Sequence, residues 1–228
     1  MQKVAFFIDG NFMRKRIFLF KSFAFYGSNI RTYCTRHLQS GEGFYRIFFY
    51  DAPPLERVTT YPSGATLDLG TLPGASQQKD LLDSIRETPD MALRLGKVAW
   101  QKDDWVLKRH VLKRLLKTGS IAGLQDSDCF PNIRQKAVDM KIGLDIATIT
   151  YKKLADRIVL IAGDSDFVPA SKLARTEGMH VTLDPLGNKV ADDLLEHIDV
   201  MYTPLNTDDP ADVDPAKRQF FVPTRKTR

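Results

Sequence analysis

The amino-acid sequence predicts an α/β fold in which a parallel, Rossmann-like sheet is flanked by helices on both faces. Apolar runs of strand length alternate along the chain with segments of helical length and period, which is the βα pattern of such folds. These runs are apolar throughout, as in VAFFI at 4–8, and this is typical of strands buried on both faces. With 228 residues, the chain is long enough to form a domain with its own core.

Each predicted strand is rich in β-branched or aromatic residues. The predicted strands span residues 4–8, 44–50, 96–100, 157–162, 180–183 and 199–202. Helices are predicted between them, most clearly where Val138, Ile142, Ile146 and Ile149 recur at three- and four-residue steps. The predicted helices span residues 11–24, 29–39, 77–94, 103–117, 137–155, 166–177 and 189–197.

Two segments fit neither pattern. Residues 52–76 are rich in proline and glycine, which predicts a long loop or a small excursion, a kind of segment that is often functional. Residues 206–228 are acidic, then basic, and rich in proline without periodicity. The predicted organisation is therefore a domain over residues 1–205 followed by a C-terminal tail.

The composition argues against several classes of protein. Cys34 and Cys129 provide neither a disulfide framework nor the paired spacing of a zinc site, so a reducing cytoplasm fits best. No uncharged stretch reaches the roughly 18 residues that a membrane span needs, and no membrane association is expected. The glycine-rich motifs of dinucleotide and P-loop sites are absent. A net charge of +5 and a pI near 9.1 favour polyanionic partners, although many basic proteins bind no nucleic acid.

Aspartates follow four of the predicted strands. They are Asp9, Asp51, Asp164, Asp166 and Asp184. Because the carboxyl ends of parallel strands meet at one edge of a sheet, where ligands bind, that edge is expected to be strongly acidic.

These residues also have a simpler interpretation, because Asp, Asn and Ser are favoured in turns and as helix N-caps. Asp9, Asn11, Ser165 and Asp166 could all serve as caps. Capping does not explain a pair in GDSD, since one cap suffices and a second carboxylate adds repulsion. Like charges packed together need a cation, or one of them must be protonated.

Two further aspartates, Asp139 and Asp145, interrupt the predicted helix 137–155. Asp139 falls in its first turn, where the helix dipole favours a carboxylate that can also point toward the edge of the sheet. Asp145 is turned by about 120° from Asp139 around the helix axis, so both can face one site only obliquely. The alternative for Asp145 is a solvated or salt-bridged position.

Together these carboxylates form an all-oxygen set, which suits Mg²⁺, or Mn²⁺, better than zinc. The predicted metal ligands are Asp9, Asp139, Asp145, Asp164 and Asp166. A divalent ion at this edge could activate water to attack a phosphodiester, and Asn11 could orient the water or the scissile phosphate. The predicted catalytic residues are Asp9, Asn11, Asp139, Asp164 and Asp166.

Three blocks of the sequence resemble the NYN domains of the LabA/DUF88 type, which belong to the PIN-like nuclease superfamily. The blocks are FIDGNF, KAVDMKIGLDIA and IVLIAGDSDFVPASKLARTEGMHVTLDPLG, and the resemblance covers roughly residues 1–202. It implies a PIN-like parallel fold, a Mg²⁺-dependent acidic site and endoribonuclease activity. Asp9, Asn11, Asp139, Asp145, Asp164 and Asp166 match the acidic and amide positions of the family. The departures are KIGLD, where members often have a more apolar run, and the long segment 52–76.

RNA binding requires Lys and Arg near the site. One basic patch, Arg14, Lys15 and Arg16, follows the first strand, and a second lies on the predicted helix 103–117 and includes Arg109, Lys113 and Arg114. The alternative for the second patch is the solvated face of a helix that packs on the core. Basic residues of the tail could also contact RNA, or simply be solvated.

The sequence therefore favours a Mg²⁺-dependent ribonuclease. The alternative is an RNA-binding or regulatory module whose pocket holds a cation without turnover. A phosphatase of the haloacid dehalogenase type lacks its second aspartate after Asp9, and a phosphorelay receiver lacks the acidic pair at the end of the first strand. The sequence leaves open whether the chain forms a homo-oligomer.

Overall fold

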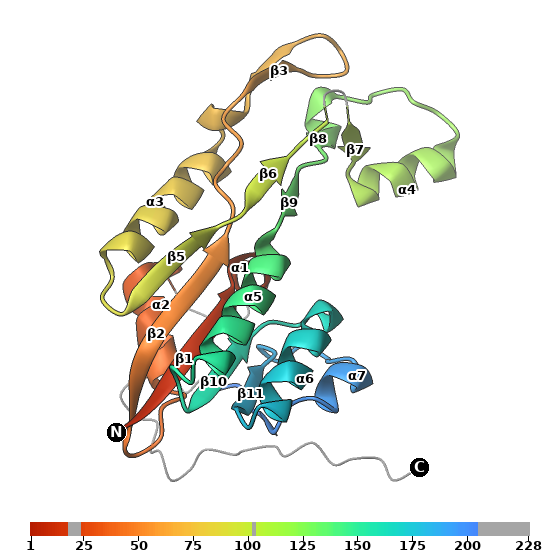
Figure 1. The fold of residues 1–228 in the computed structure, drawn as a ribbon. Coiled ribbons are helices and arrows are strands. Elements are labelled where there is room, and N and C mark those ends of the chain that lie inside the picture. Colours follow the sequence, from red (N-terminus) through yellow and green to blue (C-terminus); the bar gives the residue numbers. More distant parts are fainter. Residues whose placement is uncertain (18–23, 102–103, 205–228) are drawn as a thin grey trace.

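A six-stranded parallel sheet forms the centre of the molecule (Figure 1). In the computed structural model, residues 1–17, 24–101 and 104–204 are described. The strand order is β12-β11-β10-β1-β2-β5, and every neighbouring pair is parallel. The strands are β1 (Gln2–Asp9), β2 (Glu42–Asp51), β5 (Met91–Leu95), β10 (Arg157–Ile161), β11 (His180–Asp184) and β12 (Val200–Met201). The predicted fold class is confirmed.

Helices cover both faces of this sheet. On one face, Ala5 and Phe7 of β1 pack in a core with side chains of α5 (Val138–Tyr151), α6 (Val168–Thr176) and α7 (Asp192–Leu195). On the other, Val4, Phe6 and Ile8 pack with α1 (Gly10–Ile17), α2 (Gly27–Thr35) and α3 (Pro73–Glu87). Successive residues of β1 thus point to opposite cores, which explains why the strand is apolar at every position.

A second group of elements projects beyond the carboxyl end of the sheet (Figure 1). We call it the arm. It consists of the hairpin β3 (Val58–Thr60) and β4 (Thr66–Asp68), the antiparallel pair β6 (Lys97–Ala99) and β9 (Arg134–Lys136), the antiparallel pair β7 (Trp105–Leu107) and β8 (Cys129–Pro131), and helix α4 (Arg109–Thr118). Two short 3₁₀ helices, η1 (Leu69–Thr71) and η2 (Asp126–Asp128), lie in its connections.

Aromatic side chains hold the arm together. The rings of Tyr61 and Trp105 lie 5.2 Å apart, and Trp100 meets Trp105 edge to face at 6.1 Å. The Arg57 guanidinium lies over the Trp100 ring. Trp105 is therefore half-buried in the arm and does not belong to the main core.

The sixth strand of the sheet lies where the sequence predicted the end of a helix. Helix α3 ends at Glu87 instead of residue 94, and Met91–Leu95 form β5. Pro89 disfavours helix at Thr88, and Asp90 adopts a left-handed φ of 65°, so the chain turns back to pair with β2. The predicted strand 96–100 is wrong as a member of the sheet, because Lys97–Ala99 pair with β9 in the arm.

The other elements differ from the prediction mainly in their limits. The predicted helix 103–117 begins only at Arg109, since Trp105–Leu107 pair with β8. The predicted helix 189–197 is reduced to α7. Segment 52–76 contains the β3–β4 hairpin, η1 and the first turn of α3. Part of the predicted helix 11–24 and the whole tail 206–228 lie outside the described residues.

None of the helices in the described part of the chain combines the length and apolar character that crossing a membrane requires.

Candidate active site

Aspartates lie at the carboxyl ends of the first strand and of its neighbour β10: Asp9 is the last residue of β1, and Asp164 follows β10 in the next turn. Asp9 closes β1, and its Oδ1 accepts a hydrogen bond of 3.0 Å from the Phe12 amide of α1. Asp164 precedes the 3₁₀ helix η3 (Ser165–Phe167), and its Oδ1 accepts a 3.2 Å hydrogen bond from the Asp166 amide. Both carboxylates therefore cap the turn that follows them. Each of these hydrogen bonds uses the Oδ1 oxygen of its carboxylate.

Helix α5 brings Asp139 to this edge. The helix begins after Ala137, whose left-handed φ of 65° turns the chain out of β9. Val138 and Ile142 then pack on the sheet, while Asp139 stays exposed in the first turn. Burial raises the pKa of the Asp139 carboxyl, and the negative charges of Asp164 and Asp166 raise it further. The structure thus places Asp139 within the electrostatic field of the GDSD pair.

Asp9 belongs to the same group. Burial raises the pKa of Asp9 to about 6, and the charges of Asp139 and Asp51 add to the shift, although amide hydrogen bonds from Phe12 and Asn11 oppose it. Asn11 is half-buried in the first turn of α1. The charge of Asp139 thus acts on Asp9, and the charges of Asp164 and Asp166 act on Asp139. We call these four residues the acidic cluster.

Asp145 points elsewhere. Its Oδ2 accepts hydrogen bonds from the Tyr50 hydroxyl at 2.8 Å and from Arg94 Nε at 3.2 Å. It lines a separate cavity of about 350 Å³ beside β2 and β5, together with Tyr45 and Phe48. The structure therefore gives Asp145 the salt-bridged position that was the alternative to a metal ligand.

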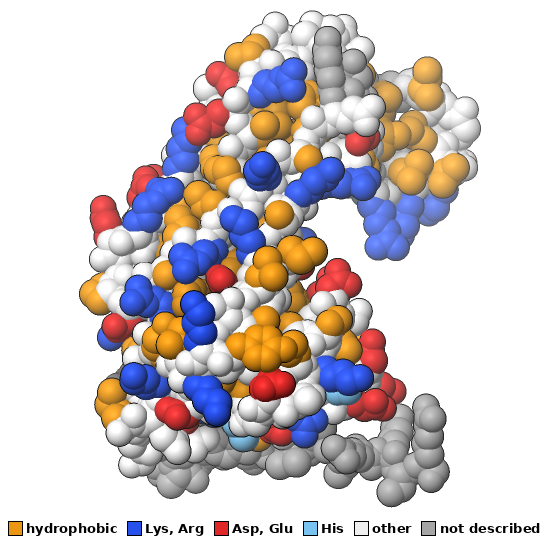
Figure 2. Space-filling view, viewed as in Figure 1, with side chains coloured by type: hydrophobic (Ala, Val, Ile, Leu, Met, Phe, Trp, Pro, Cys, Tyr) orange, Lys and Arg blue, Asp and Glu red, His pale blue; other side chains and the backbone are white. Residues whose placement is uncertain are grey.

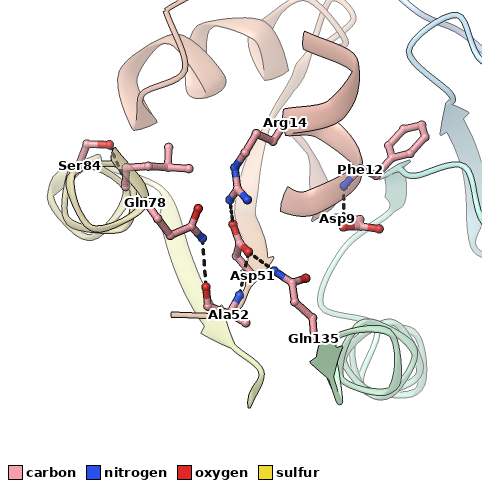
Figure 3. Close-up of polar contacts among 9 residues, drawn as sticks. Asp9, Phe12, Arg14, Asp51, Ala52, Gln78, Ser84 and Gln135 are labelled. Carbon is pink, nitrogen blue, oxygen red and sulfur yellow. Dashed lines mark hydrogen bonds and ion pairs between the residues drawn. The ribbon is translucent and has the colours of Figure 1, made fainter. Parts of the chain in front are cut away.

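Asp51, at the end of β2, is also near Asp9, but it is fully buried and paired (Figure 3). Arg14 of α1 forms an ion pair with its Oδ2, and Gln135 of β9 donates a 2.7 Å hydrogen bond to its Oδ1. The Ala52 amide donates a further bond of 2.8 Å. Asp51 thus joins three segments that lead to the cluster. The sequence marked Asp51 and Arg14 separately but contained no indication that they pair.

The aspartate at the end of β11 is also buried and hydrogen-bonded. Asp184 is fully buried, and it accepts hydrogen bonds from Tyr33 at 2.6 Å, His37 at 3.0 Å and Thr203 at 2.6 Å. The sequence gives no indication that His37 and Asp184, which lie 147 residues apart in the chain, form a hydrogen bond. At β2 and β11 the strand-end carboxylates are thus buried and paired with other side chains, whereas those at β1 and β10 have no such side-chain partner among the described residues. The predicted acidic edge is therefore limited to two of the four strand ends.

Two of the three cations in the first predicted basic patch already have partners within the protein. Arg14 pairs with Asp51, and Arg16 Nη2 donates to the Leu186 carbonyl at 3.3 Å, whereas Lys15 is exposed. In the second patch, Arg114 pairs with Asp128 at 3.3 Å, while Arg109 and Lys113 are exposed without an ion pair to any described residue.

The chemistry of the acidic cluster fits a divalent cation. Its donors are carboxylate oxygens, and mutual repulsion raises the pKa of Asp9 and of Asp139, which a bound cation would reverse. Within the described ranges, no three acidic, His or Cys side chains lie close enough to ligate one ion together. Mg²⁺ requires only one or two direct carboxylates and keeps several waters, so the residues suit an ion held partly through water.

A comparison with protein families gives one match, in which the NYN domain corresponds to residues 76–204. The chain belongs to the NYN domain family. The matched span contains α5 and the GDSD turn. Asp9 lies before the matched span, but the pairing of β1 with β10 places it at the same edge of the sheet as the GDSD turn. Neither the comparison with curated proteins nor the comparison with solved structures found a match.

Proposed function

We propose that this NYN protein is a divalent-metal-dependent endoribonuclease that hydrolyses RNA phosphodiester bonds at the acidic cluster. The observation that carries the proposal is the convergence of four carboxylates at one edge of the sheet from β1, α5 and the turn after β10. Within the described residues, no Lys or Arg forms an ion pair with any of them. A structural role would favour carboxylates that are paired or fully hydrogen-bonded, as at Asp51 and Asp184.

Each residue has a role in this proposal. Asp9, Asp139, Asp164 and Asp166 hold Mg²⁺ or Mn²⁺, either directly or through its waters. When bound, the ion lowers the pKa of a water and stabilises the negative oxygens of the phosphate. Asn11, two residues after Asp9, orients the attacking water or the scissile phosphate through its amide. Lys15 and the other cations of α1 lie next to the site and contact the RNA backbone.

The resemblance to NYN domains of the LabA/DUF88 type supports the same reaction, since it implies endoribonuclease activity. The net charge of +5 favours a polyanionic substrate. Two cysteines without a disulfide framework fit action in the cytoplasm.

The test is cleavage of RNA by purified protein carrying Asp9→Asn or Asp164→Asn. Each change keeps the size of the side chain and removes the charge, so we expect a loss of about a hundredfold or more in rate. EDTA should abolish cleavage by the unmodified protein, and Mg²⁺ or Mn²⁺ should restore it.

Asp80→Asn is the matched control, because Asp80 is exposed on α3 and has no ion pair within the described residues. It should cleave RNA normally, and thermal unfolding should show that all variants are folded. Cleavage that survives both site substitutions, or that is insensitive to EDTA, would reject the proposal.

One observation favours the alternative of an RNA-binding or regulatory module without turnover. The described carboxylates do not form a group of three at ligating distance. Filter binding separates the two functions, since RNA that is retained for hours with Mg²⁺ but yields no product would identify the module.

A further inference from the structure

Helix α4 of the arm has an unusual distribution of charge. Arg109, Lys113 and Lys117 recur at four-residue steps and therefore form one stripe along the helix. All three are exposed, and α4 contains no acidic residue. Like charges at this spacing repel one another and destabilise a helix by a few tenths of a kcal/mol per pair. The stripe therefore has a cost that an anionic ligand would remove.

Packing does not explain why the stripe is there. Val111 is the only residue of α4 that is buried, and Leu116 on the apolar side is 78% exposed. Arg114 is held by Asp128, but no described carboxylate pairs with Arg109, Lys113 or Lys117. These three cations are thus available to a partner.

The arm places the stripe opposite the body of the protein. Figure 2 shows a hollow between the arm and the body, with Lys and Arg side chains below α4 on one wall and acidic side chains on the other. The return strand of the arm, β9, leads directly into α5 and Asp139, and Gln135 is fixed to Asp51 at its base. The basic stripe and Asp139 are therefore carried by one continuous segment of the chain, from α4 through β9 to α5.

RNA binding needs cations outside the acidic cluster, because the cluster itself is negatively charged. The acidic cluster repels phosphate, and a bound divalent ion offsets only part of that repulsion. Of the cations nearest to it, Arg14 is paired with Asp51 and Arg16 contacts Leu186. Lys15 is exposed, and the α4 stripe adds three exposed cations on the arm, where Figure 2 shows Lys and Arg side chains along the hollow.

We propose that α4 grips single-stranded RNA by its backbone, so that phosphates flanking the scissile bond lie along Arg109, Lys113 and Lys117. The inference rests on the proposed nuclease function and adds its substrate class, namely flexible strands long enough to extend from the acidic cluster to the arm. Contacts to phosphate carry no base preference, so the grip is independent of sequence.

The test compares the double variant Lys113→Glu/Lys117→Glu with the control Arg46→Glu/Lys152→Glu. Arg46 and Lys152 are exposed, without ion pairs among the described residues, and the two variants lose the same charge. Binding is measured by fluorescence anisotropy with a labelled uridine RNA of roughly 30 nucleotides, which forms no duplex. The Asp9→Asn background prevents cleavage during the measurement.

We expect the α4 variant to bind this RNA about tenfold or more weakly at low salt, and the slope of log affinity against log salt to fall by about two. In the cleavage-competent protein, kcat/KM for the long RNA should fall to a similar extent. Hydrolysis of the small diester bis(p-nitrophenyl) phosphate, which cannot reach α4, should be unchanged.

The outcomes separate the two proposals. If the small diester and the RNA both resist hydrolysis by the unmodified protein, the nuclease function fails, while the binding measurement still decides the grip. If the α4 variant binds and cleaves the long RNA like the unmodified protein, or if the control loses as much, the grip is wrong. Circular dichroism and thermal unfolding check that the variants are folded. The variant Lys113→Gln/Lys117→Gln changes the charge by less and should give an intermediate loss of affinity.

Discussion

Asp9 combines two roles that the sequence presented as alternatives. One carboxylate oxygen caps the first turn of α1 at Phe12, and the other oxygen is left at the acidic edge. The cap fixes the orientation of the side chain, and burial together with the neighbouring charges disfavours its ionised form. The hydrogen bond thus orients a side chain whose ionised form is disfavoured in the structure.

This arrangement predicts how stability depends on pH without metal. The pKa of Asp9 rises from an ordinary 3.8 to about 6 on folding, so the folded protein binds a proton more tightly than the unfolded chain. The contribution of Asp9 to stability is therefore greatest below about pH 4 and is lost as the pH rises through about 6. Between these limits the loss amounts to about 1 to 3 kcal/mol.

Asp9→Asn should remove this loss, so that denaturant unfolding in EDTA shows the variant gaining stability relative to the unmodified protein as the pH rises from about 4 to 7. Asp80→Asn should show no such gain. A difference between the Asp9 variant and the unmodified protein that is constant with pH would contradict the assigned pKa.

Among the secondary-structure elements, the ion pair of Asp51 with Arg14 fastens α1 to the end of β2, and Gln135 extends the connection to β9 (Figure 3). Both helices that carry site residues, α1 and α5, thus depend on one buried carboxylate. The geometry of the acidic cluster follows from this connection as much as from the sheet.

The two partners of this ion pair should not be equivalent. Asp51 has no exposure, whereas the Arg14 side chain is 35% exposed. Arg14→Met leaves a buried carboxylate without its cation and should reduce the free energy of unfolding by about 3 kcal/mol or more. Asp51→Asn leaves an arginine that can turn toward water, so a smaller loss of about 1 to 2 kcal/mol is expected.

Urea unfolding of both single variants and of the double variant measures this asymmetry. The double variant should be more stable than Arg14→Met alone, because it no longer buries a charge. Equal losses for the two single variants would show that the pair does not carry the buried charge in the way described.

At the scale of the whole molecule, the proposed metal site would couple folding to the binding of metal and of protons. A divalent ion that binds only the folded chain stabilises it, and protons compete with that ion at Asp9 and Asp139, whose pKa values are raised. Mg²⁺ should therefore raise the melting temperature more at about pH 7.5 than at about pH 5.

Differential scanning fluorimetry with and without Mg²⁺ at the two pH values tests this coupling. The Asp9→Asn/Asp139→Asn variant should show little stabilisation at either pH, and Asp80→Asn should behave like the unmodified protein. An equal rise at both pH values, or a rise that survives in the double variant, would place the metal elsewhere.

The sequence by itself determined the parallel α/β fold, the order of most elements and the position of Asp9, Asp51, Asp164 and Asp184 at or just after the carboxyl ends of strands. It did so because these features are local: continuous apolar runs identify strands buried on two faces, and a residue that ends a parallel strand necessarily lies at the carboxyl edge. The strand Met91–Leu95 escaped this reasoning, since MALRL is compatible with helix and only pairing with β2 makes it a strand.

Only the tertiary structure decided which strand-end aspartates are exposed. Asp9, Asp51 and Asp184 each close a strand and look equivalent in sequence. In the structure, however, Arg14 forms an ion pair with Asp51, and His37 forms a hydrogen bond with Asp184, both from distant parts of the chain. The hollow between α4 and the body is likewise set by β6 and β9, which pair across almost 40 residues. Charge and burial depend on such long-range contacts, whereas periodicity and turn preference depend on neighbours along the chain.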